Sequence, residues 1–214
     1  MKPNNNIIIS VGRQLGSGGH IIAKKLAEEF GCKFYDRELI NLAAQESGFS
    51  KEFFEKNDER KGFLEQIFHM HVPFISDSSF YDNGLSQENL FRLQSDAIRK
   101  AADESSCVFV GRCADYVLRE HPNLVTLFIT ADIDERIENI RQRHSCSAEE
   151  AQKIIDNQES TRSNYYNYYT GKTWGSSASY DLCVNSSRLG IERTKDFIAA
   201  YIRATLGLEN KTSK

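Results

Sequence analysis

The 214-residue sequence lacks any run of about 18 apolar residues, the length that a helix needs to cross a membrane. Its start also lacks the charged and apolar regions of a secretory leader, because residues 1–6 lead into only three apolar residues, Ile7, Ile8 and Ile9. These absences argue against a membrane protein and against a secreted one. They predict a cytoplasmic protein that does not engage membranes.

An excess of charge of one sign is also missing. The 27 Lys and Arg residues are balanced by 30 Asp and Glu residues, so the formal net charge is -3. This balance argues against a protein that binds nucleic acid through bulk electrostatic attraction, but it leaves room for a local basic site. Apolar residues make up 40% and charged residues 27%, which is ordinary for a globular protein, and the length suits one domain with a sizeable core.

Paired cysteine spacings are absent. The five cysteines are an odd number and no two are spaced as Cys-x-x-Cys, which argues against a disulfide framework and against a structural zinc site. Cys107 and Cys183 lie in apolar runs typical of strands, so both are expected to be small buried thiols.

The apolar residues that are present occur in short continuous runs that alternate with segments of helical periodicity. Such runs are typical of strands buried on both faces. Strands joined by helices predict an α/β fold, with a parallel sheet of about five strands covered by helices on both faces. The expected strands are residues 7–11, 32–35, 107–111, 124–129 and 182–184. The expected helices are residues 21–30, 37–46, 51–61, 86–102, 134–143, 148–166 and 191–206.

A glycine-rich segment follows the first expected strand. Residues 12–19 read Gly-Arg-Gln-Leu-Gly-Ser-Gly-Gly, and a helix is expected directly afterwards. Glycines let backbone N–H groups approach a phosphate closely at a helix N-terminus. The segment departs from the P-loop pattern GxxxxGK(S/T), since Arg13 stands at its first glycine, Gly19 at its lysine and His20 at its hydroxyl residue. It predicts an anion-binding loop, and a turn needed only for tight strand-to-helix packing is the alternative.

Two arginines are placed for phosphate contacts. Arg13 lies within the loop, where a guanidinium can substitute for the missing lysine. Arg112 follows the strand expected at residues 107–111, at the edge of a parallel sheet where ligands bind. A solvated surface arginine is the alternative for each. Asp115 either contacts the substrate or caps the turn at residues 116–120.

Arginines and aromatic residues gather in the C-terminal third. Residues 156–162 place two carboxylates and an arginine on one helical face, which favours an ordinary ion-pair ladder. The alternative is an arginine-bearing lid, with arginines at Arg136, Arg141, Arg143 and Arg162, that closes over a transferring phosphoryl group. The aromatic residues of 165–175 could stack on a base, but packing of the lid against the body is the expected role.

Taken in order, these segments resemble the cytidylate kinase-like family from about residue 7 to residue 205. The resemblance rests on five co-linear motifs, at residues 10–19 (SVGRQLGSGG), 34–40 (FYDRELI), 110–116 (VGRCADY), 165–175 (YYNYYTGKTWG) and 180–187 (YDLCVNSS). It implies a P-loop kinase fold and transfer of the γ-phosphoryl group of ATP, with Mg²⁺, to CMP or dCMP. The implied partners are small-molecule nucleotides.

The resemblance also implies how the chain is organised. Residues 1–208 would form one kinase-like domain, with an acceptor-binding insert at about 36–105 and a helical lid at about 141–175. Residues 209–214 would form a loose tail. Six positions differ from the motif residues of the family. They are Gly19 for lysine, Val110 and Cys113 for two acids that help read cytosine, Ile155 for the first arginine of the lid motif, Arg37 for a small hydroxyl residue and Leu42 for an arginine.

The candidate site combines the loop with residues that the resemblance carries over. Donor phosphates are expected at Gly16, Ser17, Gly18, Gly19 and His20, with Arg13 assisting. The resemblance makes Arg112 and Arg162 ligands of the acceptor phosphate and Glu159 a partner of the ribose. The remaining candidates are Asp36, Arg37 and Asp115 for substrate binding, Arg141 and Arg143 for charge neutralisation as the lid closes, and Ser17 as the nearest hydroxyl for Mg²⁺.

Two other functions fit the same residues. A nucleotide-binding or regulatory protein that kept the fold and lost the reaction would also lack the P-loop lysine. A kinase of another small metabolite would also lack both base-reading acids. The sequence does not predict the acceptor base or the oligomeric state.

Overall fold

The computed structural model of the protein describes residues 6–37, 40–41 and 87–208. The chain divides into two units, one made of residues 1–37 and 101–214 and the other of residues 38–100. Every strand in the described part of the chain lies in the first unit, as does every candidate site residue. Helix α6 (Gln87–Glu104) begins in the second unit and ends in the first.

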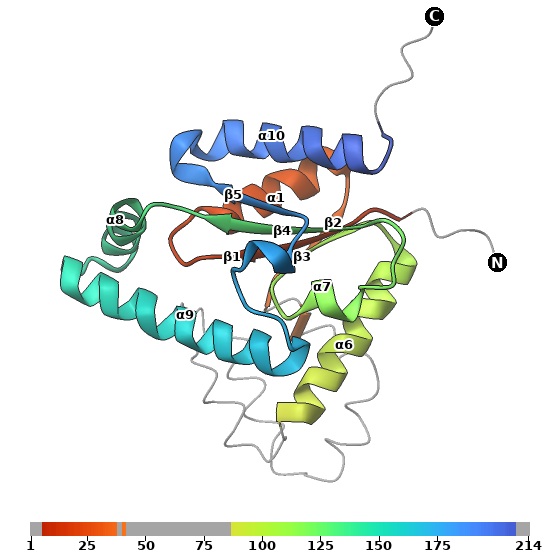
Figure 1. Ribbon diagram of the computed structural model, residues 1–214, viewed down its shortest axis with the longest axis horizontal. Coiled ribbons are helices and arrows are strands. Elements are labelled where there is room, and N and C mark those ends of the chain that lie inside the picture. The colour runs from red at the N-terminus through yellow and green to blue at the C-terminus, as the bar shows by residue number, and fades with distance from the viewer. Residues whose placement is uncertain (1–5, 38–39, 42–86, 209–214) are drawn as a thin grey trace, which may run out of the picture. The chain divides into compact units, whose positions relative to one another are not determined.

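A five-stranded parallel sheet forms the centre of the first unit (Figure 1). The strands are β1 (Ile8–Arg13), β2 (Lys33–Tyr35), β3 (Cys107–Val110), β4 (Leu124–Thr130) and β5 (Leu182–Asn185), in the order β2-β3-β1-β4-β5. The central strand β1 pairs Ile9 with Val108 of β3 on one side and with Val125 of β4 on the other. Since every neighbouring pair is parallel, the carboxyl ends of the strands meet at one edge of the sheet.

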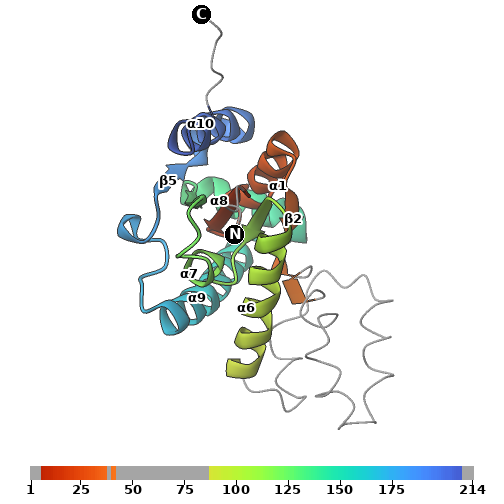
Figure 2. The same ribbon diagram turned by 90° about the vertical axis from the view of Figure 1, so that its right-hand side faces the viewer.

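Helices cover both faces of this sheet (Figures 1 and 2). On one face α1 (Gly19–Phe30) and α10 (Gly190–Thr205) pack their apolar residues against inward residues of β1, β3 and β4, which makes the main hydrophobic core. On the other face lie α7 (Ala114–Val117) and α9 (Ala148–Thr170). Both faces of β1 are therefore shielded from water, as the continuous apolar run at its start predicts.

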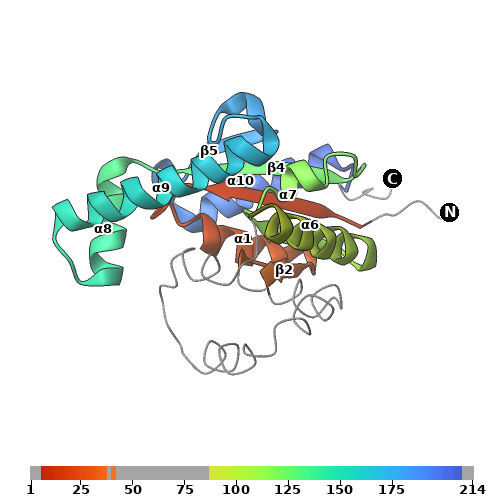
Figure 3. The ribbon, with the colours of Figure 1, turned by 90° about the horizontal axis from the view of Figure 1, so that it is seen from below.

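Helices α8 (Ile133–His144) and α9 form an arm beside the sheet (Figure 3). A second, smaller core of Ile140, Ala151 and Ile155 joins them. A capping box at Ser147 starts α9, with the Ser147 hydroxyl accepting from the N–H of Glu150, and Gly171 in the left-handed conformation ends it. Two short 3₁₀ helices, η2 (Ser177–Ser179) and η3 (Ser186–Arg188), flank β5.

The predicted α/β fold with a parallel sheet of five strands is confirmed. The helix predicted at residues 148–166 ends four residues too early, because α9 continues past residue 166 to Thr170. The helix expected at residues 51–61 and the tail at 209–214 lie outside the described residues, as does most of the helix expected at 37–46. Within the described residues, no helix combines the length and the apolar composition that crossing a membrane requires.

The five cysteines all lie in the described part of the chain and are free thiols. Cys107 is buried, as expected. The expectation for Cys183 is wrong, since this residue is exposed. The reason is its position on β5, an edge strand whose residues are only partly covered.

Candidate functional site

The glycine-rich loop connects β1 to α1 at the carboxyl edge of the sheet. Within the loop, the Ser17 hydroxyl donates to the carbonyl of Gln14 at 2.9 Å and accepts from the N–H of Gly19 at 3.3 Å. Gly16 and Gly18 have positive φ angles of 81° and 72°. Only glycine adopts this left-handed conformation without strain, so these two positions turn the backbone sharply on either side of Ser17.

The amides of the loop fall into two groups. The N–H of Gln14 donates to the carbonyl of Ile129 at 3.0 Å, and the N–H of Leu15 donates to Glu159 Oε1 at 3.0 Å. Among the described residues, the N–H groups of Gly16, Gly18 and His20 have no hydrogen-bond partner. Unpaired N–H groups at the start of a helix attract anions, so this part of the loop is able to receive one.

Arg13 fills the space that a lysine at position 19 would need. A Cβ added to Gly19 would lie 2.6 Å from Arg13 Cβ, and one added to Gly111 would lie 2.7 Å from Arg13 Nη1. The Arg13 side chain therefore runs past Gly19 toward the turn after β3. Arg13 therefore stands where the P-loop pattern has a glycine, and Gly19 stands where the pattern has its lysine. As a result, the positive charge comes from the end of β1 and not from the start of α1.

Four arginines gather around this point. Burial, together with the nearby charges of Arg162, Arg112 and Arg37, lowers the pKa of Arg13 to about 9, although the charge of Asp36 opposes this. Arg162 also donates from Nη1 to the carbonyl of Arg13 at 3.3 Å. Burial likewise lowers the pKa of Arg162. Charges of one sign that are held together and partly shielded from water favour the binding of an anion, because the anion relieves their repulsion.

Arg112 reaches this cluster from a tight turn after β3. Gly111, Arg112 and Cys113 have φ angles of 79°, 56° and 56°, so three consecutive residues are left-handed. Such a conformation is costly at Arg112 and Cys113 and is often retained at ligand-binding sites. The Arg112 guanidinium lies over the ring of Tyr165 on α9, 5.3 Å from its centroid. Burial raises the pKa of the Cys113 thiol to about 12, so this thiol stays protonated.

Asp115 lies deeper than the arginines. It is buried inside the first turn of α7, and its carboxylate accepts a hydrogen bond of 2.7 Å from the Tyr166 hydroxyl on α9. Burial raises the pKa of Asp115, although the hydrogen bond from Tyr166 and the charge of Lys172 partly offset this. Asp115 is not the N-cap of α7, because Cys113 occupies that position, but the backbone N–H groups of Asp115 and Tyr116 in this turn also lower the pKa of Asp115 through hydrogen bonds. Asp115 also connects α7 to α9.

Asp36 and Arg37 follow β2, at the same edge of the sheet. The His20 ring lies 3.4 Å from Asp36 Oδ2 and packs edge-on against Phe34, with ring centroids 5.3 Å apart. His20 thus brings the start of α1 next to the end of β2. Arg37 belongs to the arginine cluster, as its effect on the pKa of Arg13 shows.

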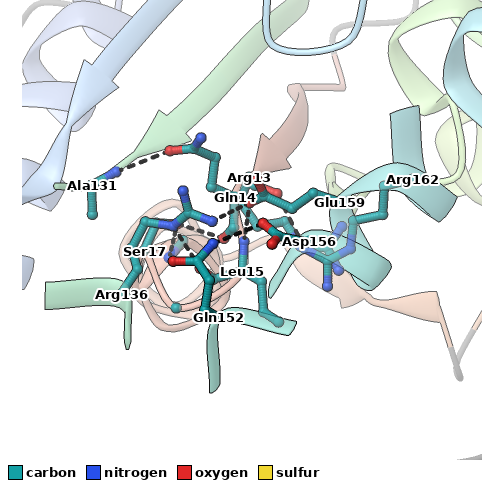
Figure 4. Close-up of polar contacts among 12 residues, drawn as sticks. Arg13, Gln14, Leu15, Ser17, Ala131, Arg136, Gln152, Asp156, Glu159 and Arg162 are labelled. Carbon is teal, nitrogen blue, oxygen red and sulfur yellow. Dashed lines mark hydrogen bonds and ion pairs between the residues drawn. The ribbon is translucent and has the colours of Figure 1, made fainter. Parts of the chain in front are cut away.

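The expected ion-pair ladder along α9 does not form among the described residues (Figure 4). Glu159 pairs with Arg136 of α8 at 2.5 Å, and Asp156 accepts from Gln152 of α9 itself at 2.8 Å. Arg136 also donates from Nε to the carbonyl of Leu15 at 2.9 Å. The ladder prediction fails because α9 packs beside the glycine-rich loop, which offers Glu159 a buried cation and an amide.

Sequence reasoning missed the role of Arg136. This residue is only 4% exposed, in a helix whose other charged residues face water. A signal was present, because Arg136 precedes the buried Ile140 by one helical turn and so lies on the apolar face of α8.

Residues 8–188 of this chain match the cytidylate kinase-like family. The chain belongs to this family. Among curated relatives of the chain, the cytidylate kinase of Pyrococcus horikoshii is 28% identical over 202 residues, which cover 94% of this chain and 90% of that protein. The cytidylate kinase of Methanopyrus kandleri is 27% identical over 214 residues, covering 96% and 97% of the two chains.

Solved structures support the same fold. An uncharacterised protein from Eubacterium ventriosum superimposes with a TM-score of 0.71 at 27% identity, covering 93% of this chain and 99% of that one. The shikimate kinase of Bacteroides thetaiotaomicron superimposes with a TM-score of 0.53 at 13% identity, covering 94% and 98%. The second likeness concerns the fold alone, which is that of the P-loop kinases.

Two groups of residues that the sequence suggests for the lid lie apart from the cluster. In the described part of the chain, Arg141 pairs with Glu138 on the exposed side of α8, and neither Arg141 nor Arg143 forms a hydrogen bond or ion pair with the loop. The aromatic residues near the end of α9 pack together, with Trp174 edge-on to Phe128 at 5.1 Å between centroids.

Membership of a kinase family implies ATP and Mg²⁺, and the two fit this site differently. The unpaired amides and the arginines suit the phosphates of a nucleotide. The Ser17 hydroxyl does not suit a metal ion, because Ser17 is buried and its hydroxyl is occupied within the loop. Nor do the described residues contain a group of three or more His, Cys, Asp or Glu side chains that could hold a metal.

Proposed function

We propose that this protein transfers the γ-phosphoryl group of ATP to a nucleoside monophosphate, with CMP or dCMP as the acceptor. The proposal is supported by membership of the cytidylate kinase-like family and by curated relatives named cytidylate kinase that match nearly the whole chain. The single observation that carries it is the cluster of Arg13, Arg37, Arg112 and Arg162 beside a loop with unpaired amides.

In this proposal the loop holds the donor. The N–H groups of Gly16, Gly18 and His20 bind the β-phosphate, and Arg13 supplies the positive charge that the P-loop lysine supplies elsewhere. Phosphoryl transfer needs positioned charge more than covalent chemistry from the protein, so a guanidinium can serve. No step is assigned to Mg²⁺, because the described residues offer it no ligand set.

The remaining arginines hold the acceptor. Arg112 and Arg162 bind the acceptor phosphate from opposite elements, and Arg37 adds a third cation at the end of β2. An acceptor phosphate oxygen forms the bond to the γ-phosphorus as the bond to the β–γ bridging oxygen breaks, and ADP leaves. Arg141 and Arg143 take part only when the lid at about 141–175 closes, and the Arg141–Glu138 pair must open first. The acceptor-binding insert is proposed at about residues 36–105.

The test is ADP formation by the purified protein with ATP, Mg²⁺ and each common nucleoside monophosphate. We expect turnover with CMP or dCMP. Arg112→Ala should raise the KM for the acceptor by about 10- to 100-fold, the effect of losing a charge-assisted hydrogen bond. Arg119→Ala is the matched control, since Arg119 is a surface arginine near the same turn that stacks on Tyr116. Absence of turnover with every monophosphate would overturn the proposal.

A second function, nucleotide binding without transfer, is favoured by one observation. Gly19 stands at the lysine position, and the Ser17 hydroxyl is used within the loop. Titration calorimetry separates the two functions. Binding of ATP and CMP without formation of ADP would support the binding protein, whereas turnover excludes it.

A further inference from the structure

The three carbonyls in the middle of the glycine-rich loop are each held by a side chain from outside the loop. Arg136 Nε donates to the carbonyl of Leu15 at 2.9 Å, and Asn139 Nδ2 donates to the carbonyl of Gly16 at 2.8 Å. The Ser186 hydroxyl lies 2.8 Å from the carbonyl of Ser17 and 3.0 Å from that of Thr130, and the shorter contact is the one to the loop. Two of these donors lie on α8 and the third begins η3.

Holding a carbonyl also fixes the direction of the next amide. A peptide unit is planar and trans, so its C=O and its N–H point in opposite directions. With the carbonyls of Leu15 and Ser17 directed at α8 and η3, the N–H groups of Gly16 and Gly18 point away from these elements. These are two of the amides that have no partner within the described residues. The Gly16 carbonyl, which Asn139 holds, precedes the N–H of Ser17, and this N–H donates to the carbonyl of Gln14 at 3.4 Å. Asn139 therefore fixes the peptide that lies between the two unpaired amides.

The ion pair between Arg136 and Glu159 completes the arrangement (Figure 4). Glu159 Oε1 accepts from both Arg136 Nη2 and the N–H of Leu15, so both backbone polar groups of Leu15 are bound by the two side chains of one ion pair. Because the Arg136 side chain is 5% exposed, the pair is shielded from water and its geometry is held firmly. Rotation of either peptide unit that Leu15 joins therefore breaks a hydrogen bond to one member of this ion pair.

We infer that Arg136 and Ser186 are positioning residues that orient the N–H groups of Gly16 and Gly18 toward the phosphates of the donor, and that Asn139 is a positioning residue that holds the peptide between them. The Arg136–Glu159 pair holds the first of these peptides in place. The inference rests on the proposed function, since it takes the ligand of the loop to be the phosphate tail of a nucleotide. A loop oriented in advance binds anions more tightly, because the amides need not reorganise when the ligand arrives. This loop depends on such orientation more than a P-loop with a lysine does, because Gly19 supplies no side-chain charge for the phosphates.

The test compares two substitutions on the same helix. Asn139→Leu removes the donor to the Gly16 carbonyl, whereas Gln142→Leu, three residues further along α8, removes a contact only to Glu138. The probe is inorganic tripolyphosphate, titrated by calorimetry and displaced by ADP. We expect Asn139→Leu to weaken tripolyphosphate binding by about 3- to 10-fold, the effect of one lost neutral hydrogen bond, and Gln142→Leu to leave it unchanged.

Kinetics add a readout that a merely structural role would not move. Asn139→Leu and Ser186→Ala should raise the KM for ATP by a similar factor and leave the KM for CMP unchanged, at a melting temperature close to that of the wild type. Because Asn139 is exposed, its variant tests the inference even where Ser186→Ala does not fold.

The outcomes separate this inference from the proposed function. Equal tripolyphosphate affinity in Asn139→Leu and Gln142→Leu overturns the inference, as does a wild type that does not bind tripolyphosphate. A wild type that binds tripolyphosphate, and loses affinity in Asn139→Leu, but forms no ADP from any monophosphate overturns the proposed transfer while supporting the orienting role.

Discussion

At the scale of single residues, the site depends on an exchange between Arg13 and Gly19. The arginine occupies the position of a P-loop glycine, and the glycine occupies the position of the lysine. The two are coupled sterically, because a Cβ on Gly19 would lie 2.6 Å from Arg13 Cβ. A lysine at position 19 therefore requires a smaller residue at position 13.

This coupling predicts the behaviour of a double substitution. Gly19→Lys alone should lower the free energy of unfolding by about 1–3 kcal/mol, because the added side chain overpacks against Arg13. Arg13→Gly alone should lower kcat by about 100-fold or more, because the donor loses its buried cation. The double variant, Arg13→Gly with Gly19→Lys, restores the P-loop arrangement and should recover at least about tenfold in kcat over Arg13→Gly. Thermal unfolding and ADP formation measure the two effects.

A double variant no more active than Arg13→Gly would contradict the exchange. It would mean that Arg13 acts through its place in the arginine cluster and not as a substitute for the lysine.

At the scale of elements, the arm formed by α8 and α9 is attached to the loop by a buried ion pair. Arg136 comes from α8 and Glu159 from α9, and both bind the backbone of Leu15. Removing one partner of such a pair leaves an uncompensated charge away from water, which costs more than the pair itself contributes. The energetic link between the arm and the loop should therefore be strong.

Glu159→Ala is expected to lower the free energy of unfolding by about 3 kcal/mol, because it leaves Arg136 buried without its partner. Urea unfolding measures this change. Asp156→Ala is the matched control, since Asp156 lies one turn earlier on α9 and accepts only from Gln152, so its effect should stay within about 0.5 kcal/mol. Glu159→Gln keeps an acceptor for Leu15 and should cost less than Glu159→Ala. Equal losses in Asp156→Ala and Glu159→Ala would show that the ion pair does not anchor the arm.

At the scale of the whole molecule, the first and last helices are joined across one face of the sheet. Glu29 near the end of α1 accepts from Lys195 at 2.6 Å and from Arg203 at 2.5 Å, both on α10. Burial raises the pKa of Glu29, but the hydrogen bonds and charges of Lys195 and Arg203 outweigh this and leave the pKa below its ordinary value of 4.5. These contacts connect the two helices over long sequence separations, because Lys195 lies 166 positions after Glu29 and Arg203 lies 174 positions after it.

The lowered pKa predicts how stability changes with pH. Because the folded state holds the Glu29 carboxylate in its charged form more strongly than the unfolded state does, the contribution is present above pH 4.5 and is lost as the pH falls through the lower folded value. Glu29→Gln should cost about 1 kcal/mol at pH 7, the upper range for a solvent-screened pair, and progressively less as the pH falls through the folded pKa of Glu29. Thermal unfolding over a series of pH values from 7 downward checks this. The neighbouring Glu28→Gln serves as control, and a cost of Glu29→Gln that does not depend on pH would contradict the assignment.

Much of the fold could be predicted from local patterns. Burial could be predicted for the β-branched run before Gly12 and for the apolar stripe of residues 22, 26 and 30. The reason is that the spacing of apolar residues along a strand or helix shows which of its faces is covered. The glycine-rich loop and Arg112 could be predicted for the same reason, since parallel strands bring their carboxyl ends to one edge. The exposure of Cys183 could not be predicted, because the residues of β5 do not reveal that the strand order places β5 at the edge of the sheet.

The partners within the site were the part that local patterns could not supply. Glu159 and Arg162 look like a ladder along one helix, and only packing of α9 beside the loop directs Glu159 to Arg136 and Arg162 to the carbonyl of Arg13. Asp115 accepts a hydrogen bond from Tyr166, which lies 51 positions later in the sequence. Ser186 donates to the carbonyl of Ser17, which lies 169 positions earlier. Contacts at such separations depend on topology and on which helix covers which face.

By itself, then, the sequence determined the alternation of strands and helices, the glycine-rich turn and the residues placed after each strand, because these follow from periodicity and from the conformational freedom of glycine. Only the tertiary structure decided which cation stands beside Gly19, which side chains hold the loop carbonyls and which arginines share one site. Hydrogen bonds and charges act over a few ångströms, so their partners are settled only when the folded chain brings distant segments together.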